Sequence, residues 1–285
     1  MPKPLEPVPA VPATTALRIS FIGGGNMASA LVGGLAGKLT DAANLHVVEI
    51  NSEARTRLSQ SGVRTSAGID ATLAGSEVIV LAVKPQQMRE VVAALKPFMT
   101  TQVLISIAAG IRAVDLSRWL DGYGAIVRTM PNTPALIGKG ITGMVALAGV
   151  TAQQRAHADA IMRAVGATVW LDDEALIDPV TALSGSGPAY VFYFIEAMQR
   201  AGEALGLTPA QASELSIATF VGASQLAADA TDPVSVLRER VTSKGGTTHA
   251  ALVSLAEGGV DQAIVRAITA ASARGKALGE EFGRD

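Results

Sequence analysis

The sequence predicts an α/β protein with an amino-terminal, doubly wound domain and an all-helical carboxy-terminal domain. Short apolar runs rich in β-formers alternate with helix-compatible stretches as far as residue 171, the pattern of a parallel sheet wrapped by helices. A glycine-rich turn follows the first run directly, and strand signals stop after Asp172. The 285 residues, 49% of them hydrophobic, suffice for two cores, so we expect domains over residues 17–171 and 172–285.

Composition and charge exclude several classes of function. A net charge of −2 without a basic block argues against nucleic-acid partners. The chain has no cysteine, and its three histidines are far apart, so neither thiolate chemistry nor a metal site is expected. The proline-rich residues 1–16 predict a disordered tail instead of a secretory signal. Since no apolar stretch reaches the roughly 18 residues of a membrane span, we expect a soluble cytoplasmic protein.

In the first domain, the strand Leu17–Gly23 leads through the glycines into a helix over Asn26–Leu39, and a second strand follows. This βαβ unit has the size typical of dinucleotide binding. Strands are expected at Leu45–Ile50, Glu77–Val83, Gln102–Ile107, Ala125–Met130, Gly143–Leu147 and Thr168–Leu171, and helices at Gln86–Leu95, Ala113–Leu120 and Thr151–Val165. Near-continuous apolar runs such as residues 78–83 indicate strands covered on both faces.

The second domain is expected to consist of helices that two subunits share. The helix Tyr190–Leu205 is apolar almost all round in its first two turns, so it must be buried on several sides. The next helix, Pro209–Ala230, repeats small residues that permit close helix contact. A monomeric bundle is the alternative, but a symmetric homodimer is favoured.

Gly23, Gly25 and Ala28 form a GxGxxA pattern between a strand and a helix. In a Rossmann-like domain the first glycine permits the tight turn, the second lets a pyrophosphate approach, and the alanine packs helix on strand. The alternative is a purely structural turn. Glu49, near the end of the second strand, stands where an acid would bind a ribose 2′-hydroxyl, whereas Asn51 and Arg55 could serve a 2′-phosphate, so the choice between NAD and NADP stays open.

Further motifs fall at strand ends and helix starts. Ala82–Pro85, Ile107–Gly110 and Arg128–Pro134 end three strands at the edge where ligands of open α/β sheets bind, although Lys84 could simply be solvated. Ser184–Pro188 is interpreted as a domain junction, with an anion site as the alternative. In Thr242–Thr248 a Gly-Gly pair precedes two hydroxyl residues that can open a helix, which predicts a site for a small anion.

Taken in order, these motifs resemble those of Δ1-pyrroline-5-carboxylate reductases, and the resemblance runs from Leu17 to the end of the sequence. The segments that carry it are Gly23–Ala28, Ala82–Pro85, Ser106–Gly110, Arg128–Pro134, Ser184–Val191 and Val241–Thr248. The last one, which contains Gly-Gly-Thr-Thr, separates this family from other Rossmann reductases. One departure is Lys244, which stands where the family usually has a proline, and it puts the stiffness of that loop in doubt.

The resemblance implies reduction of the cyclic imine 1-pyrroline-5-carboxylate to L-proline, with NADP as the expected cofactor and NAD as the alternative. It implies that Thr248 donates a hydrogen bond to the ring nitrogen and that Ser243, Gly245, Gly246 and Thr247 bind substrate. It assigns the cofactor to Gly23, Gly25, Asn26, Met27, Ala28, Asn51, Ala82, Val83, Lys84, Pro85, Ala108 and Ala109. It also implies helical domains that interlock into homodimers, with decamers as a further stage of assembly.

This chemistry is compatible with the residues, because a protonated imine accepts hydride readily and needs only a neutral hydroxyl beside it. Two rival functions remain at this stage. A β-hydroxyacid dehydrogenase or another imine reductase would share the layout, but a catalytic lysine is normally found on an interdomain helix, and Pro188–Leu205 contains none. A non-catalytic NAD(P)-sensing protein would leave Ser243–Thr248 without an evident use.

Overall fold

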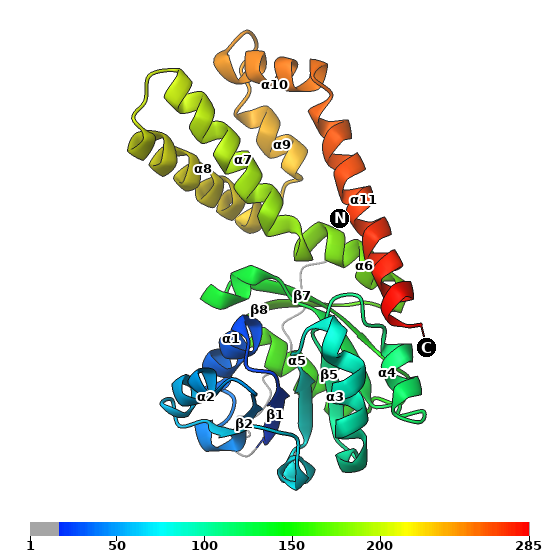
Figure 1. Ribbon diagram of the computed structural model, residues 1–285. Helices are drawn as coiled ribbons and strands as arrows, with labels where there is room; N and C mark the ends of the chain where they lie inside the picture. Colours follow the sequence, from blue (N-terminus) through cyan, green and yellow to red (C-terminus); the bar gives the residue numbers. More distant parts are fainter. Residues whose placement is uncertain (1–16, 285) are drawn as a thin grey trace. The chain divides into compact units, whose positions relative to one another are not determined.

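The computed structural model describes residues 17–284, so the expected tail over residues 1–16 lies outside the described residues. The chain divides into two compact units. The first extends to Gly185 and resumes at Ala271, and the second is Ser186–Ala270. These limits differ from the expected boundary between residues 171 and 172, and the long helix α11 (Val260–Phe282) contributes to both units (Figure 1).

The first unit is built on an eight-stranded sheet with the order β3-β2-β1-β4-β5-β6-β7-β8. Its strands are β1 Ile19–Ile22, β2 Leu45–Val48, β3 Arg64–Ser66, β4 Val78–Leu81, β5 Val103–Ser106, β6 Ile126–Met130, β7 Gly140–Ala146 and β8 Gly166–Trp170. The first six follow the doubly wound order in which the chain direction across the sheet reverses between β1 and β4. Most neighbours are parallel, as expected, but β7 runs antiparallel to β6, which the apolar runs did not indicate.

Successive residues of the central strands enter two different cores, one on each face of the sheet. In β4, Val78 and Val80 join one core, whereas Ile79 and Leu81 join the other. Helices α1 and α5 cover the first face, and α3 and α4 cover the second. Burial on both faces explains why these strands read as continuous apolar runs, and it confirms the doubly wound α/β class.

The helices of the first unit are α1 Asn26–Leu35, α2 Ser52–Ser59, α3 Met88–Leu95, α4 Ala113–Trp119, α5 Ala152–Arg163 and the short α6 Ile177–Val180. Helix α1 ends earlier than expected, because Ala36 is extended and Gly37 turns the chain with φ +73°. Sequence patterning did not reveal α2 and β3. Helix α2 is polar and buries Leu58 alone, and β3 has three residues, too few for a periodic signal.

The carboxy-terminal end of α11 packs on the first unit although it is remote in sequence. A Cβ at Gly110 would lie 3.1 Å from Leu278 and 3.2 Å from Phe282. Arg118 donates to the carbonyl oxygen of Gly283 at 2.5 Å. The segment after Ala271 therefore belongs to the core of the first unit, not to the helical unit.

The second unit consists of helices: α7 Gly187–Ala204, α8 Pro209–Asp229, α9 Val234–Arg240, α10 Thr247–Glu257 and the first part of α11. Helices α7 and α8 form a hairpin (Figure 1), where Gly202 approaches Ala212 so closely that a Cβ would lie 3.2 Å from the alanine methyl group. Ala212 and Ser216 are the only buried residues between 186 and 270. Among residues 17–284, no helix combines the length and apolar character needed to cross a lipid bilayer.

Candidate functional site

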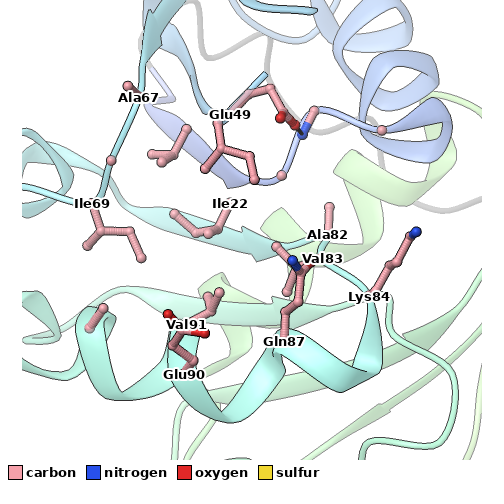
Figure 2. Close-up of a pocket in the computed structure, with 17 residues that line it drawn as sticks. Ile22, Glu49, Ala67, Ile69, Ala82, Val83, Lys84, Gln87, Glu90 and Val91 are labelled. Carbon is pink, nitrogen blue, oxygen red and sulfur yellow. Dashed lines mark hydrogen bonds between the residues drawn. The ribbon is translucent and has the colours of Figure 1, made fainter. Parts of the chain in front are cut away.

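A cavity of about 460 Å³ opens at the carboxyl edge of the sheet, where the strand order reverses between β1 and β4 (Figure 2). Such a crevice is where open α/β sheets bind their ligands. Its walls come from the ends of β1, β2 and β4, from the segment after β3 and from α3. They are formed by Ile22, Gly23, Gly24, Gly25, Val48, Glu49, Ile50, Ala67, Gly68, Ile69, Ala82, Val83, Lys84, Gln87, Glu90, Val91 and Ala94.

The turn after β1 requires glycine at its first position. Gly23 has φ +102°, and a Cβ there would lie 2.6 Å from the carbonyl oxygen of Ala82. The backbone N–H of Gly23 donates to Val48 at 2.8 Å, and Ala82 donates to Ile22 at 2.8 Å. The turn is thereby fixed between the ends of β2 and β4.

The space in front of α1 can admit an anionic group. Gly25 caps this ten-residue helix without a side-chain hydrogen bond, and a Cβ at Gly25 would meet nothing within 4 Å. The first N–H groups of a helix lack partners within it and carry partial positive charge. The turn therefore fits the pyrophosphate of a dinucleotide.

Glu49, directly after β2, is held by the backbone on both sides of its carboxylate. Oε2 accepts from the N–H of Gly24 at 2.7 Å, and Oε1 accepts from the N–H of Asn51 at 2.7 Å. The amide oxygen of Asn51 caps α2 by accepting from Ala54 at 2.9 Å. Arg55 donates from Nη1 to the carbonyl oxygens of Glu49 at 2.7 Å and Ile50 at 2.9 Å.

The structure brings some of the expected cofactor residues together at this cavity and leaves others outside its walls. Gly23, Gly25, Ala82, Val83 and Lys84 line it; Asn26, Met27, Ala28, Asn51, Pro85, Ala108 and Ala109 do not. Ala28 packs in the core, where its role is the close contact between helix and strand.

Sequence reasoning missed the cavity walls contributed by Ala67, Gly68, Ile69, Gln87, Glu90 and Val91. The residues after β3 were missed because β3 itself had no signal. The helical period of residues 86–95 could have indicated which side of α3 faces the sheet.

Of the three strand ends that were expected to meet at one crevice, only the one at Ala82–Lys84 contributes to this cavity. Arg128 on β6 is buried and donates to Glu174 at 3.0 Å. Glu174 also accepts from the N–H of Ala113 at 2.5 Å. Burial raises the pKa of nearby Asp178, against the opposing effect of Arg128. Arg128 thus joins β6 to the start of α4 and to the segment before α6.

The expected substrate residues lie in the second unit, in the turn between α9 and α10. Gly245 has φ +73°, and Gly246 donates its N–H to Ser243 at 3.0 Å. A Cβ at Gly246 would lie 2.4 Å from the hydroxyl of Ser243. Gly245 is therefore required by its positive φ, whereas a side chain at Gly246 would need the hydroxyl of Ser243 to rotate away.

The helix that follows this turn begins with polar groups that have no partner in the part of the chain that the structure describes. Helix α10 starts at Thr247 and has eleven residues, and its cap Gly246 supplies no side-chain hydrogen bond. The hydroxyl of Thr242 donates to Arg238 at 2.6 Å. Among residues 17–284, nothing forms a hydrogen bond with the hydroxyls of Ser243, Thr247 and Thr248. The turn can thus offer hydroxyl and N–H donors together to a small carboxylate.

Comparison with protein families and solved structures covers both units. Residues 18–110 match the family model described as NADP oxidoreductase coenzyme F420-dependent. Residues 174–278 match the model described as pyrroline-5-carboxylate reductase dimerisation. The second match extends from Glu174 of the first unit through the whole helical unit.

Individual relatives match nearly the whole chain. A pyrroline-5-carboxylate reductase of Pseudomonas aeruginosa is 43% identical over 94% of this chain and 98% of its own length. One from Haemophilus influenzae is 40% identical over 91% and 97%. A solved pyrroline-5-carboxylate reductase from Coxiella burnetii superposes with a TM-score of 0.87 and 39% identity, covering 92% of this chain and 98% of that one. The Plasmodium falciparum enzyme with NADP bound gives a TM-score of 0.84 and 29% identity, covering 93% and 99%.

Proposed function

The chain belongs to the pyrroline-5-carboxylate reductase family, and we propose that it reduces 1-pyrroline-5-carboxylate to L-proline, the last step of proline synthesis. The structural observation that carries the proposal is the start of α10, where no group of residues 17–284 bonds the hydroxyls of Ser243, Thr247 and Thr248 and where the first helix N–H groups lie beside them. An anion site with neutral donors suits a substrate that combines a carboxylate with an imine.

We propose that the cavity of the first unit holds NADP, with NAD as the alternative. The open space at Gly25 receives the pyrophosphate, and the apolar side chains of Val48, Ile69 and Val91 offer walls for the adenine. When bound in reduced form, the nicotinamide supplies the hydride. Support comes from the match of residues 18–110 to an NADP oxidoreductase model and from the bound NADP of the Plasmodium falciparum relative.

In the proposed reaction, the turn before α10 binds the substrate carboxylate. The N–H groups at the start of α10 and the hydroxyl of Ser243 donate to it, and the partial positive charge of the helix terminus favours it. Lys244 is exposed in the same turn and adds a cation there. Holding the carboxylate fixes the ring, so orientation supplies much of the acceleration.

Thr248 is proposed to form a hydrogen bond with the ring nitrogen. Its hydroxyl oxygen accepts from the N–H of the protonated imine, and its hydroxyl hydrogen donates to the lone pair that the nitrogen regains as the hydride adds. The imine carbon gains a hydride, the C=N double bond becomes a single bond, and the nitrogen ends with one proton more than the neutral imine. That proton arrives from solvent, because a cyclic imine is readily protonated before it binds. Thr248 therefore orients and stabilises the polarised C=N group, and no strong acid is required.

We further propose that the protein is a homodimer built from the second unit, with decamers as a further stage, and that it works in the cytoplasm. The match of residues 174–278 to a dimerisation model supports oligomer formation. Helix α7 has no buried residue, and its side chains Val191 and Phe192 are 40% and 60% exposed. One chain alone leaves these apolar side chains uncovered.

Oxidation of NADPH and NADH by the purified protein, with and without 1-pyrroline-5-carboxylate, tests the proposed reaction. We expect oxidation that depends on the imine, with proline formed in equal amount. Reduction of NADP by a β-hydroxyacid without any imine activity would support the dehydrogenase alternative. Tight cofactor binding without turnover would support a sensor.

A further inference from the structure

The placement of Glu49 bears on which nicotinamide dinucleotide the cavity prefers. Figure 2 shows its carboxylate directed at the glycine-rich turn, and the two contacts of 2.7 Å with Gly24 and Asn51 hold it there. A carboxylate has about four lone-pair positions, so each oxygen can accept a second hydrogen bond. Glu49 is thus an oriented anion with remaining acceptor capacity at the end of β2.

The groups that could compensate a 2′-phosphate at this strand end are partly engaged by the protein itself. The backbone N–H of Asn51 donates to Glu49, and its amide oxygen caps α2. Arg55 is turned toward the backbone, where Nη1 donates to the carbonyl oxygens of Glu49 and Ile50. Arg55 does not line the cavity.

The charges of the side chains that line the cavity also disfavour a 2′-phosphate. The acidic ones are Glu49 and Glu90, and the only basic one is Lys84. A phosphate monoester carries a charge of about −1.5 to −2 at neutral pH. Bringing it beside Glu49 places like charges together, whereas a ribose 2′-hydroxyl would donate a hydrogen bond to the same carboxylate.

We propose that Glu49 is the specificity-determining residue for the cofactor, and that it makes this chain bind NADH more tightly than NADPH while both remain usable. The inference rests on the proposed function only in taking the cavity as the dinucleotide site. It reverses the order of cofactors given under the proposed function and differs from the NADP bound to the Plasmodium falciparum relative, because the contacts of Glu49 in this chain set the charge at the end of β2.

Direct binding measured without imine substrate tests the proposal. We expect wild-type protein to bind NADH about tenfold more tightly than NADPH, and Glu49→Gln to shift the ratio of the two dissociation constants toward NADPH by about tenfold or more. Competition by ADP and by 2′,5′-ADP isolates the adenosine end, and it should show the same shift. Glu53→Gln is the matched control, because this exposed residue of α2 carries the same charge without lining the cavity.

A wild-type preference for NADPH would overturn the proposal whether or not the variant folds. Equal shifts in Glu49→Gln and Glu53→Gln would also overturn it, because only net charge would then matter. Since binding is measured without imine, failure of the protein to form proline would refute the proposed reaction and leave this result standing. A normal proline-forming enzyme with an unchanged cofactor ratio would refute only the role of Glu49.

Discussion

The α-carbon of Gly23 faces the carbonyl oxygen of Ala82, and a Cβ at that position would lie 2.6 Å from the oxygen. This contact joins the turn after β1 to the end of β4, the two strands between which the cavity opens. Gly25, two residues later, has open space where its Cβ would be. The fold therefore requires glycine at position 23, whereas the absence of a side chain at Gly25 leaves open space beside the cavity.

Gly23→Ala is expected to destabilise the protein by at least about 2 kcal/mol, because it combines a positive φ with a backbone collision. Urea unfolding monitored by circular dichroism measures the change. Gly33→Ala in α1 is the control, since a Cβ there meets nothing within 4 Å. Unchanged stability of Gly23→Ala would show that the turn can relax.

Gly25→Ala is expected to leave the fold intact and to weaken dinucleotide binding by at least about tenfold, or about 1.4 kcal/mol. The added methyl group would occupy space in the cavity that the pyrophosphate needs. Titration with NADPH and NADH measures the affinities, and Gly33→Ala again serves as the control. Wild-type affinity in Gly25→Ala would place the pyrophosphate elsewhere.

Thr248→Ala is expected to lower turnover by about 10- to 100-fold, with dinucleotide affinity nearly unchanged, because one hydrogen bond to the reacting group is worth roughly 1–3 kcal/mol. Steady-state kinetics with saturating cofactor measures it. Thr242→Val is the control, because it removes a hydroxyl from the same turn. That hydroxyl donates to the carbonyl oxygen of Arg238 and not to the substrate, so its loss should affect stability more than turnover. Full activity of Thr248→Ala would remove this residue from the mechanism.

His46 is expected to make stability decrease as the pH falls below about 6.5. Burial is the main cause that lowers its pKa in the folded protein; Arg64 lowers it further and Asp70 opposes both. As the pH falls below about 6.5, His46 therefore becomes protonated in the unfolded chain but not yet in the folded protein. The free energy of unfolding decreases until the pH reaches the lower pKa of the folded state. Urea unfolding across pH 5 to 8 should show this slope in wild type and a smaller one in His46→Gln.

Two serine hydroxyls lie within hydrogen-bond distance of the His46 ring. Nδ1 lies 3.2 Å from the hydroxyl of Ser20, and Nε2 lies 3.0 Å from that of Ser66. His249→Gln, at an exposed position, is the control and should retain the wild-type slope. Identical slopes in wild type and His46→Gln would assign the pH dependence to other groups.

Phe192→Asp is expected to prevent a stable dimer and to yield aggregating protein, because burying such a side chain is worth roughly 1.5–3 kcal/mol and a charge cannot replace it. Sedimentation over a wide concentration range measures the assembly. Val114→Asp on α4, where the native side chain is 52% exposed, is the control for a charge on the first unit. A folded, active monomer of the Phe192 variant would contradict the shared helical core.

The sequence by itself determined the elements whose signals are local or strongly patterned. Doubly covered strands such as β4 are apolar at every position, and glycines mark turns that other residues cannot adopt. These features predicted the α/β class, the dinucleotide turn and the carboxy-terminal helices. The sequence did not predict the short β3 or the polar α2. Three residues are too few to show a period, and α2 buries a single side chain.

Only the tertiary structure decided the features that depend on residues distant in sequence. It brought the N–H of Gly24 to the carboxylate of Glu49 and ran β7 antiparallel to β6. It also placed Leu278 and Phe282 against Gly110, in a unit that the chain had left at Gly185. Composition and periodicity predict whether a residue is buried. Long-range packing decides which residues it is buried against.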